Sequence, residues 1–224
     1  MRTDRHGRPY HPAKFSPAIL KRLSEILIDD ALVLDPFAGT GLIHSIPNII
    51  SWGVEIEPEW AGMHPRTVVG DATALPFGNR SFFYIVTSCV YGNRMSDHHD
   101  AKDGSVRNTY KHSLGRDLHP NNAGRMHYAK GKRGLAYRTL HRKAWREAWR
   151  VLRPGGCLVL NVKNFYKGDE LVNVAGWHRW TLRKIGFELI ERHVVSVKGN
   201  KHGENRDRRV PFEYVYVFRK PEAA

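Results

Sequence analysis

The segment ALVLDPFAGTG, residues 31–41, constrains the fold of this chain more than any other stretch. Its first residues form the Val- and Leu-rich run of a strand buried on both faces, and Asp35 stands where that strand ends. Gly39 and Gly41 allow the backbone to turn tightly and to approach a ligand closely, with the amides of a following helix facing it. The segment therefore predicts an α/β unit with a ligand at the end of its first strand.

Strands and helices alternate along most of the sequence. Periodicity predicts amphipathic helices over 16–28, 139–152 and 174–186, with Trp145 and Trp149 on the apolar stripe of the second. Such alternation is typical of a mostly parallel sheet with helices on both faces. A chain of 224 residues is long enough for one core of this kind, so a single domain over 1–224 is expected. Further strands are predicted at 49–57, 67–77 (short, then a loop), 81–88, 155–162, 187–197 and 211–220.

Residues 93–138 interrupt this alternation of strands and helices. They lack hydrophobic periodicity and are rich in Gly, Asn, His and basic residues, which predicts a basic, loop-rich insertion at about 96–138. Much of the net charge of +14 is concentrated in this region: residues 101–150 hold thirteen Lys and Arg against three Asp and Glu, whereas 31–90 hold two against five. Basic residues interleaved with His and Tyr favour a polyanion, so nucleic acid is the expected partner.

Composition argues against several other classes of protein. No apolar run approaches the ~18 residues of a membrane span, and the polar, basic residues 1–10 do not resemble a signal peptide. Cys89 and Cys157 form no CxxC pair, so neither a disulfide framework nor a zinc site is expected. The histidines of SDHHDAKDGS (96–105) have no partner at zinc spacing, so no metal is predicted. We expect a cytoplasmic protein.

Two further acidic residues stand at predicted strand ends. Glu55 lies twenty residues after Asp35, near the end of the second strand, and Asp71 follows the third. An acid at the position of Glu55 can accept hydrogen bonds from both hydroxyls of an adenosine ribose. For each carboxylate alone, a helix cap or a surface ion pair is the better explanation, and only the three together favour a site. Neither G-x-G-x-x-G nor a P-loop motif is present, which disfavours NAD and ATP.

The tetrad Ser88-Cys89-Val90-Tyr91 stands where the buried strand over 81–88 opens into a loop. Polar and aromatic residues at such a strand end usually mark a site. Serine suggests a hydrogen-bond partner, cysteine a nucleophile and tyrosine a stacking surface.

Taken in order along the chain, these motifs resemble those of the S-adenosylmethionine-dependent DNA amino-methyltransferases, which methylate N6 of adenine or N4 of cytosine. The resemblance covers nearly the whole chain except 96–138. It implies a Rossmann-like class I methyltransferase fold with a mostly parallel seven-stranded sheet. The segments that carry it are HPAKFSPAIL, VLDPFAGTG, GVEIEPEW, VGDATALPF, SCVY and RVLRPGGCLVLNV.

The resemblance implies S-adenosylmethionine as the cofactor. Asp35 would face the methionine ammonium, Glu55 would hold the ribose and Asp71 the adenine amine. Phe37 and the backbone of 38–41 would line the methionine and the ribose. The cofactor-binding residues implied in this way are Phe15, Asp35, Pro36, Phe37, Ala38, Gly39, Gly41, Glu55, Ile56, Asp71 and Ala72.

In that family the tetrad reads Asp/Asn/Ser-Pro-Pro-Tyr/Phe, whereas here Cys89 and Val90 stand in place of the prolines. The resemblance implies that Ser88 and the Cys89 carbonyl accept hydrogen bonds from the target amine, while Tyr91 stacks on the extruded base. Without proline the loop loses rigidity, which leaves open a catalytically weakened module that only binds nucleic acid. Covalent cytosine-C5 methylation through Cys89 is disfavoured, because the chain has no Pro-Cys and no Glu-Asn-Val segment.

The expected partner is double-stranded DNA with its target base flipped out, although an RNA methyltransferase fits the same fold and charge. The candidate nucleic-acid contacts lie after the tetrad and in the basic segment, at Asn93, Arg94, Lys130, Lys132 and Arg133.

Overall fold

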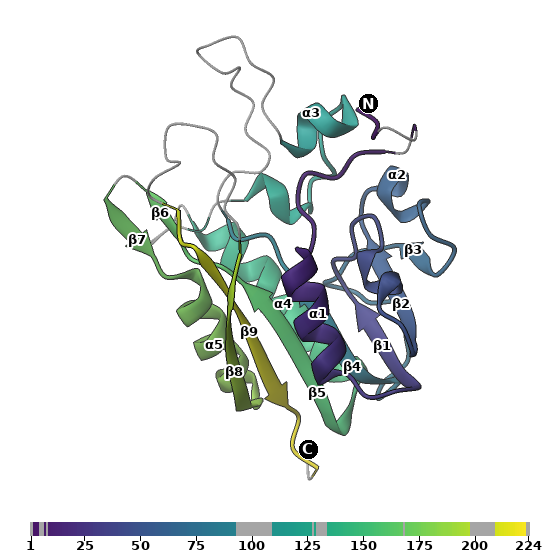
Figure 1. The fold of residues 1–224 in the computed structure, drawn as a ribbon, viewed down its shortest axis with the longest axis vertical. Coiled ribbons are helices and arrows are strands. Elements are labelled where there is room, and N and C mark those ends of the chain that lie inside the picture. Colours follow the sequence, from purple (N-terminus) through teal and green to yellow (C-terminus); the bar gives the residue numbers. More distant parts are fainter. Residues whose placement is uncertain are drawn as a thin grey trace.

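The computed structural model of the chain (Figure 1) describes residues 2–4, 7, 9–92, 109–126, 128, 134–167, 169–197 and 209–222. Its helices are α1 (Pro17–Ile26), α2 (Pro58–Ala61), α3 (Tyr110–Leu114), α4 (Leu135–Val151) and α5 (Val174–Ile185), with 3₁₀ turns η1 (Leu42–Ser45) and η2 (Ala123–Arg125). Its strands are β1 (Ala31–Asp35), β2 (Ile49–Glu55), β3 (Thr67–Val69), β4 (Phe82–Ser88), β5 (Leu152–Val162), β6 (Phe165–Lys167), β7 (Glu170–Val172), β8 (Glu188–Ser196) and β9 (Phe212–Arg219).

Seven of these strands form one sheet in the order β3-β2-β1-β4-β5-β9-β8. The strands β1 to β5 pair in parallel, and β9 runs antiparallel to both of its neighbours. The predicted mostly parallel sheet and its closing pair of strands are thus confirmed. Because the parallel strands point the same way, the residues at their carboxyl ends meet at one edge of the sheet.

Helices cover both faces of the sheet, as Figure 1 shows with α1 in front and α4 and α5 behind. The helix α1 begins after Ser16, whose hydroxyl accepts the Ile19 N–H at 3.3 Å, and its buried Ile19 and Leu23 pack on one face. On the other face the predicted apolar stripe of α4 places Trp145 in the core, fully buried. In the described part of the chain, no helix has the length and apolar character needed to cross a membrane.

The connection between β1 and β2 differs from the sequence prediction. Instead of the helix expected after the glycine turn, the chain forms only the 3₁₀ turn η1, which Gly41 begins at a φ of 77°. The helix prediction is wrong because β2 starts at Ile49 and Pro47 lies just before it, so too few residues remain for an α-helix.

The region expected to be loop-rich contains secondary structure. Both α3 and η2 lie within 96–138, and α4 starts at Leu135 rather than at residue 139. Tyr110 and Leu114 of α3 pack with Trp60 of α2 in a separate small core. The two-stranded sheet β6–β7 is likewise absent from the sequence prediction. Short elements of this kind depend on tertiary packing more than on local periodicity, so the pattern does not reveal them.

Gly53 is expected to be essential to the centre of this sheet. A Cβ at this position of β2 would lie 2.7 Å from both Ala38 Cβ and Thr67 Oγ1. We predict that Gly53→Ala destabilises the fold by about 1–3 kcal/mol, because the neighbouring strand and turn must shift. Urea unfolding measures the loss, with the exposed Gly78→Ala, whose Cβ meets only Ser81 Oγ at 3.4 Å, as the control. Equal stability of the two variants would contradict the prediction.

Candidate active site

A pocket of about 300 Å³ opens at the carboxyl ends of the central strands. The structure gathers the predicted cofactor residues around it, and Ser88, Cys89, Val90 and Tyr91 line it as well. Gly41 does not line the pocket, because it lies at the start of η1 behind the turn. The predicted cofactor residues in the lining are Phe15, Asp35, Pro36, Phe37, Ala38, Gly39, Glu55, Ile56, Asp71 and Ala72.

Asp35 lies in the pocket at the end of β1 and is only 1% exposed. Its Oδ1 accepts hydrogen bonds from Thr87 Oγ1 at 2.7 Å and from the Phe37 N–H at 3.0 Å. Burial raises the pKa of this carboxyl to about 7, although both hydrogen bonds oppose the shift. A cation beside Asp35 would favour the ionised form, so the residue suits a ligand that carries an ammonium group.

Glu55, at the end of β2, fastens the glycine turn to the sheet. Its Oε2 accepts the Gly39 N–H at 2.9 Å and its Oε1 accepts the Glu57 N–H at 2.9 Å. Burial raises the pKa of Glu55 to about 7. Each carboxylate oxygen retains a second lone pair, so the side chain can accept ligand hydroxyls as well. Gly39 has a φ of 53°, and a Cβ there would come within 3.2 Å of His11 Nε2.

Asp71 is the third acid of the pocket and is more exposed than the other two. Its Oδ1 accepts the Thr73 N–H at 2.8 Å and its Oδ2 accepts Asn121 Nδ2 at 2.9 Å. Burial acts to raise the pKa of Asp71, but these hydrogen bonds outweigh it and the pKa lies below its usual value. An ionised acceptor beside an amide is suited to recognising the edge of an adenine.

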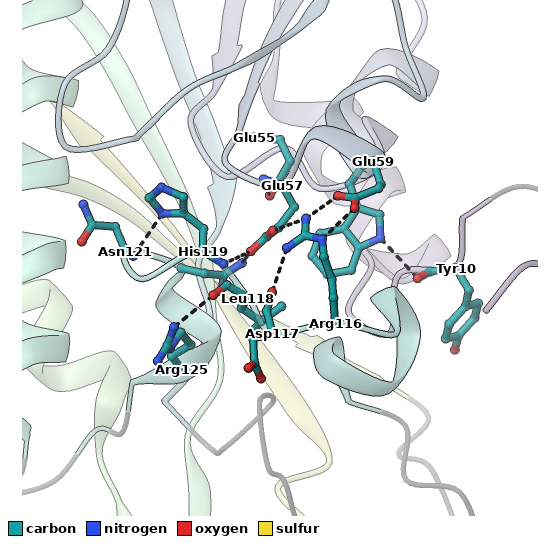
Figure 2. Close-up of polar contacts among 12 residues, drawn as sticks. Tyr10, Glu55, Glu57, Glu59, Arg116, Asp117, Leu118, His119, Asn121 and Arg125 are labelled. Carbon is teal, nitrogen blue, oxygen red and sulfur yellow. Dashed lines mark hydrogen bonds and ion pairs between the residues drawn. The ribbon is translucent and has the colours of Figure 1, made fainter. Parts of the chain in front are cut away.

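Figure 2 shows Glu57, just after the end of β2, in contact with Arg116 and His119 of the segment that follows α3. The Glu57 side chain is fully buried, and its Oε1 accepts the His119 N–H and Asn122 Nδ2, each at 2.8 Å. Its Oε2 accepts Arg116 at 2.8 Å, and the same guanidinium pairs with Glu59. A buried carboxylate requires such compensation. This cluster was not predicted from the sequence, where its only signal is the two Glu residues, Glu57 and Glu59, that follow Glu55 in the run VEIEPE.

Aromatic rings close another wall of the pocket. The His11 ring lies edge-on to Trp60, with 4.2 Å between ring centroids, and 5.0 Å from Tyr110. Burial lowers the pKa of His11 to about 4, so the ring is neutral near pH 7. All three rings line the pocket together with Phe15, which the sequence analysis had assigned to it.

Ser88 and Tyr91, which also line the pocket, contact each other through their hydroxyl groups. The Tyr91 hydroxyl lies 3.2 Å from Ser88 Oγ, 3.4 Å from Asn161 Oδ1 and 3.3 Å from Glu213 Oε2. Asn161 Nδ2 also donates to Glu213 Oε2 at 3.0 Å. These contacts hold the Tyr91 ring in one orientation. The sequence analysis missed Glu213, although it is the one acidic residue in the aromatic run PFEYVYVF.

Cys89 points its thiol into the protein core. The residue is 1% exposed, and its Sγ lies 3.6 Å from His178 Nε2. Burial raises the pKa of the thiol to about 12. A thiolate nucleophile requires a lowered pKa, so this environment disfavours covalent chemistry through Cys89.

The predicted nucleic-acid contacts lie outside the described residues. They are Asn93, Arg94, Lys130, Lys132 and Arg133, and the histidines of 96–105 also fall there.

No family model and no curated protein matches the chain at a significant level. Among solved structures, a SAM-dependent methyltransferase from Methanosarcina mazei is 13% identical, with 93% of this chain and 99% of that chain covered and a TM-score of 0.56. A 1,6-didemethyltoxoflavin-N1-methyltransferase from Burkholderia thailandensis, with S-adenosylhomocysteine bound, is 17% identical, with 92% and 79% covered and a TM-score of 0.53. The (4+2)-cyclase SpnF is 14% identical, with 96% and 86% covered and a TM-score of 0.52.

At these identities the likeness shows the fold, and the predicted Rossmann-like class I methyltransferase fold is confirmed. The cyclase among the neighbours shows that this fold alone does not determine the reaction.

The raised pKa of Asp35 predicts that ligand binding depends on pH. Below about pH 7 the carboxyl is protonated, and a ligand ammonium must displace that proton. We expect S-adenosylhomocysteine affinity to fall by up to about 10-fold per pH unit below pH 7. Calorimetry at several pH values measures the affinity. The control is Asp35→Asn, which should bind S-adenosylhomocysteine more weakly and with a shallower dependence on pH. Affinity that is independent of pH in the wild type would remove Asp35 from the site.

Arg116 is expected to hold the segment beside the pocket in place. We predict that Arg116→Met lowers the free energy of unfolding by about 1–2 kcal/mol, because buried Glu57 loses its cation. The loss is kept this small because Arg116 is partly exposed and solvent weakens the ion pair. Binding of S-adenosylhomocysteine should also weaken, since Asn121 of the same segment contacts Asp71. The control is Lys111→Met, whose exposed pair with Asp117 should contribute under about 1 kcal/mol. Similar losses in both variants, measured by thermal unfolding, would contradict the prediction.

Proposed function

We propose that this chain is an S-adenosylmethionine-dependent methyltransferase that acts on the exocyclic amino group of adenine (N6) or cytosine (N4) in DNA. The observation that supports the proposal is that the strand-end acids and the Ser88–Tyr91 pair line the same pocket. Three strand-end acids, Asp35, Glu55 and Asp71, occupy one part of it, and the Ser88–Tyr91 pair occupies another.

The pocket residues fit S-adenosylmethionine. Gly39 leaves open the space that a Cβ would fill, and the buried Asp35 has the chemistry to hold the cofactor's ammonium group. Glu55 can accept the ribose hydroxyls and Asp71 the adenine amine. When bound, the cofactor supplies an electrophilic methyl group on a sulfonium.

The groups around Ser88 suit an amine acceptor. The nitrogen of an exocyclic amine is a poor nucleophile, since its lone pair is delocalised into the ring, and hydrogen-bond acceptors around the NH₂ group counteract this. Ser88 Oγ and the Cys89 carbonyl can act in this way, and Glu213 adds a carboxylate within 3.3 Å of the Tyr91 hydroxyl. These acceptors would hold the amine protons while the nitrogen bonds to the methyl carbon and the electrons of the sulfur–methyl bond return to sulfur. The methylated nitrogen would then release one proton to solvent water.

Tyr91 suits the stacking of an extruded base. A base must leave the duplex for its amino group to reach the pocket, at a cost of a few kcal/mol that stacking partly offsets. Because Ser88, Asn161 and Glu213 hold the hydroxyl, the ring of Tyr91 is already oriented for contact.

The charge of the chain favours DNA as the partner. A net charge of +14, concentrated between residues 101 and 150, would attract phosphates through counterion release. The described part of this region includes the α4 side chains of Arg142, Lys143 and Arg146, which are at least partly exposed.

Nucleoside analysis tests the proposal directly. Mass spectrometry of DNA and RNA from cells expressing the wild type should show N6-methyladenine or N4-methylcytosine in DNA. Tyr91→Ala should lower that level by about 10-fold or more, because base stacking is lost. Tyr91→Phe should lower it less, because the ring remains and only the contacts that orient the hydroxyl are lost. S-adenosylhomocysteine binding should persist in both variants.

Three outcomes would count against this assignment. Methylation confined to RNA would overturn the choice of DNA. 5-Methylcytosine as the product would overturn the amine target. No methylation together with retained DNA binding would indicate a module that only binds nucleic acid.

A further inference from the structure

The Ser88–Tyr91 loop lacks prolines, yet its backbone is held by buried side chains. We propose that Trp145, His178 and Tyr137, here termed the brace, position this loop for methyl transfer by fixing the Val90 carbonyl. The inference rests on the proposed function and assigns the brace the stiffening role that the two prolines have in the family that the chain resembles.

The hydrogen bonds of the brace permit one arrangement of protons. Trp145 Nε1–H can only donate, and it lies 3.1 Å from His178 Nδ1, which must therefore accept. His178 then carries its proton on Nε2, which lies 2.9 Å from the Tyr137 hydroxyl and donates to it. The Tyr137 O–H is left to donate to the Val90 carbonyl at 2.7 Å. Every donor in this series has an acceptor, and the series ends on the loop backbone.

The brace is rigid because it lies wholly in the core. The side chains of Trp145, His178 and Tyr137 are all fully buried. Burial lowers the pKa of His178 well below its usual value and raises that of Tyr137 well above. Both groups therefore remain neutral near pH 7, and the proton arrangement stays the same.

The ring of Tyr137 also supports the far end of the loop. It packs edge-on against Tyr128, with 5.5 Å between ring centroids, and the Tyr128 N–H donates to the Gly92 carbonyl at 3.1 Å. The loop is thus held at Val90 by the hydroxyl of Tyr137 and at Gly92 through its ring. Replacing Tyr137 with Phe would remove the first contact and keep the second.

A metal site is the main alternative for this cluster. Ligand atoms of Cys89, His141 and His178 all lie within 4.8 Å of one another, and the buried His141 Nε2 has no hydrogen-bond partner among the described residues. However, the Trp145 N–H places the His178 proton on Nε2, the atom nearest Cys89 Sγ. A protonated nitrogen cannot bind a metal, so the hydrogen bond from Trp145 disfavours this alternative.

The first test is Tyr137→Phe, studied by hydrogen exchange and by single-turnover methyl transfer from S-adenosylmethionine to DNA. We expect faster exchange of the Val90–Gly92 amides and a transfer rate at least about 10-fold lower, because the acceptors lose their alignment. The affinity for S-adenosylhomocysteine should not change. Unchanged exchange in the loop would overturn the inference. This readout needs no activity, so it distinguishes failure of the brace from failure of the proposed function.

Two substitutions of His178 distinguish the effect of its hydrogen bonds from the effect of its volume. Gln can accept from Trp145 and donate to Tyr137, whereas Leu can do neither. We expect His178→Gln to keep slow loop exchange and His178→Leu to lose it. Equal behaviour of the two variants would overturn the inference. So would stoichiometric zinc in the purified wild type that is lost in His141→Ala, since a metal on His178 Nε2 would displace the proton given to Tyr137.

Discussion

The parallel pairing of β1 with β4 at the centre of the sheet is the constraint on which the site depends. The chain runs outward from β1 to β2 and β3, then returns to place β4 on the other side of β1. At such a reversal the connections leave in opposite directions and open a crevice at the strand ends. The 2.7 Å hydrogen bond from Thr87 to Asp35 joins the two strands there. Ser88 and the rest of the tetrad follow immediately, so the strand-end acids and the tetrad line one pocket at this edge of the sheet.

Three buried acids at this edge are stabilised in two different ways. Glu57 is compensated inside the protein by Arg116 and two further donors, and it has a structural role. Asp35 and Glu55 accept only neutral donors, and the described residues include no salt bridge to either. Burial raises the pKa of both carboxyls to about 7, and no cation of the described residues opposes the shift. The pocket thus holds two carboxyl groups that no cation of the described residues neutralises, and a cationic ligand would favour their ionised form.

Rigidity in a catalytic loop can come from its backbone or from its surroundings. Proline restricts the backbone dihedral angle directly. A buried hydrogen bond to a loop carbonyl, such as that from Tyr137 to Val90, restricts the same segment from outside. The absence of prolines from the Ser88–Tyr91 loop therefore does not by itself mean that the loop is mobile. The fixed orientation of Tyr91, whose hydroxyl contacts residues of β5 and β9, has a similar origin.

The sequence alone determined the strands of the seven-stranded sheet, the glycine turn, the three amphipathic helices α1, α4 and α5, and the three strand-end acids. These features depend on residues within a few positions of one another, and local periodicity and turn chemistry reveal them. Only the tertiary structure decided that Glu57 would hold Arg116 and that Glu213 would reach Tyr91. It also decided that Tyr137 would brace the tetrad. Each of these contacts joins segments that are far apart in the sequence, so each depends on how the sheet brings distant segments together. No local pattern records that geometry, because a buried polar side chain is stabilised by partners that arrive only when the chain folds.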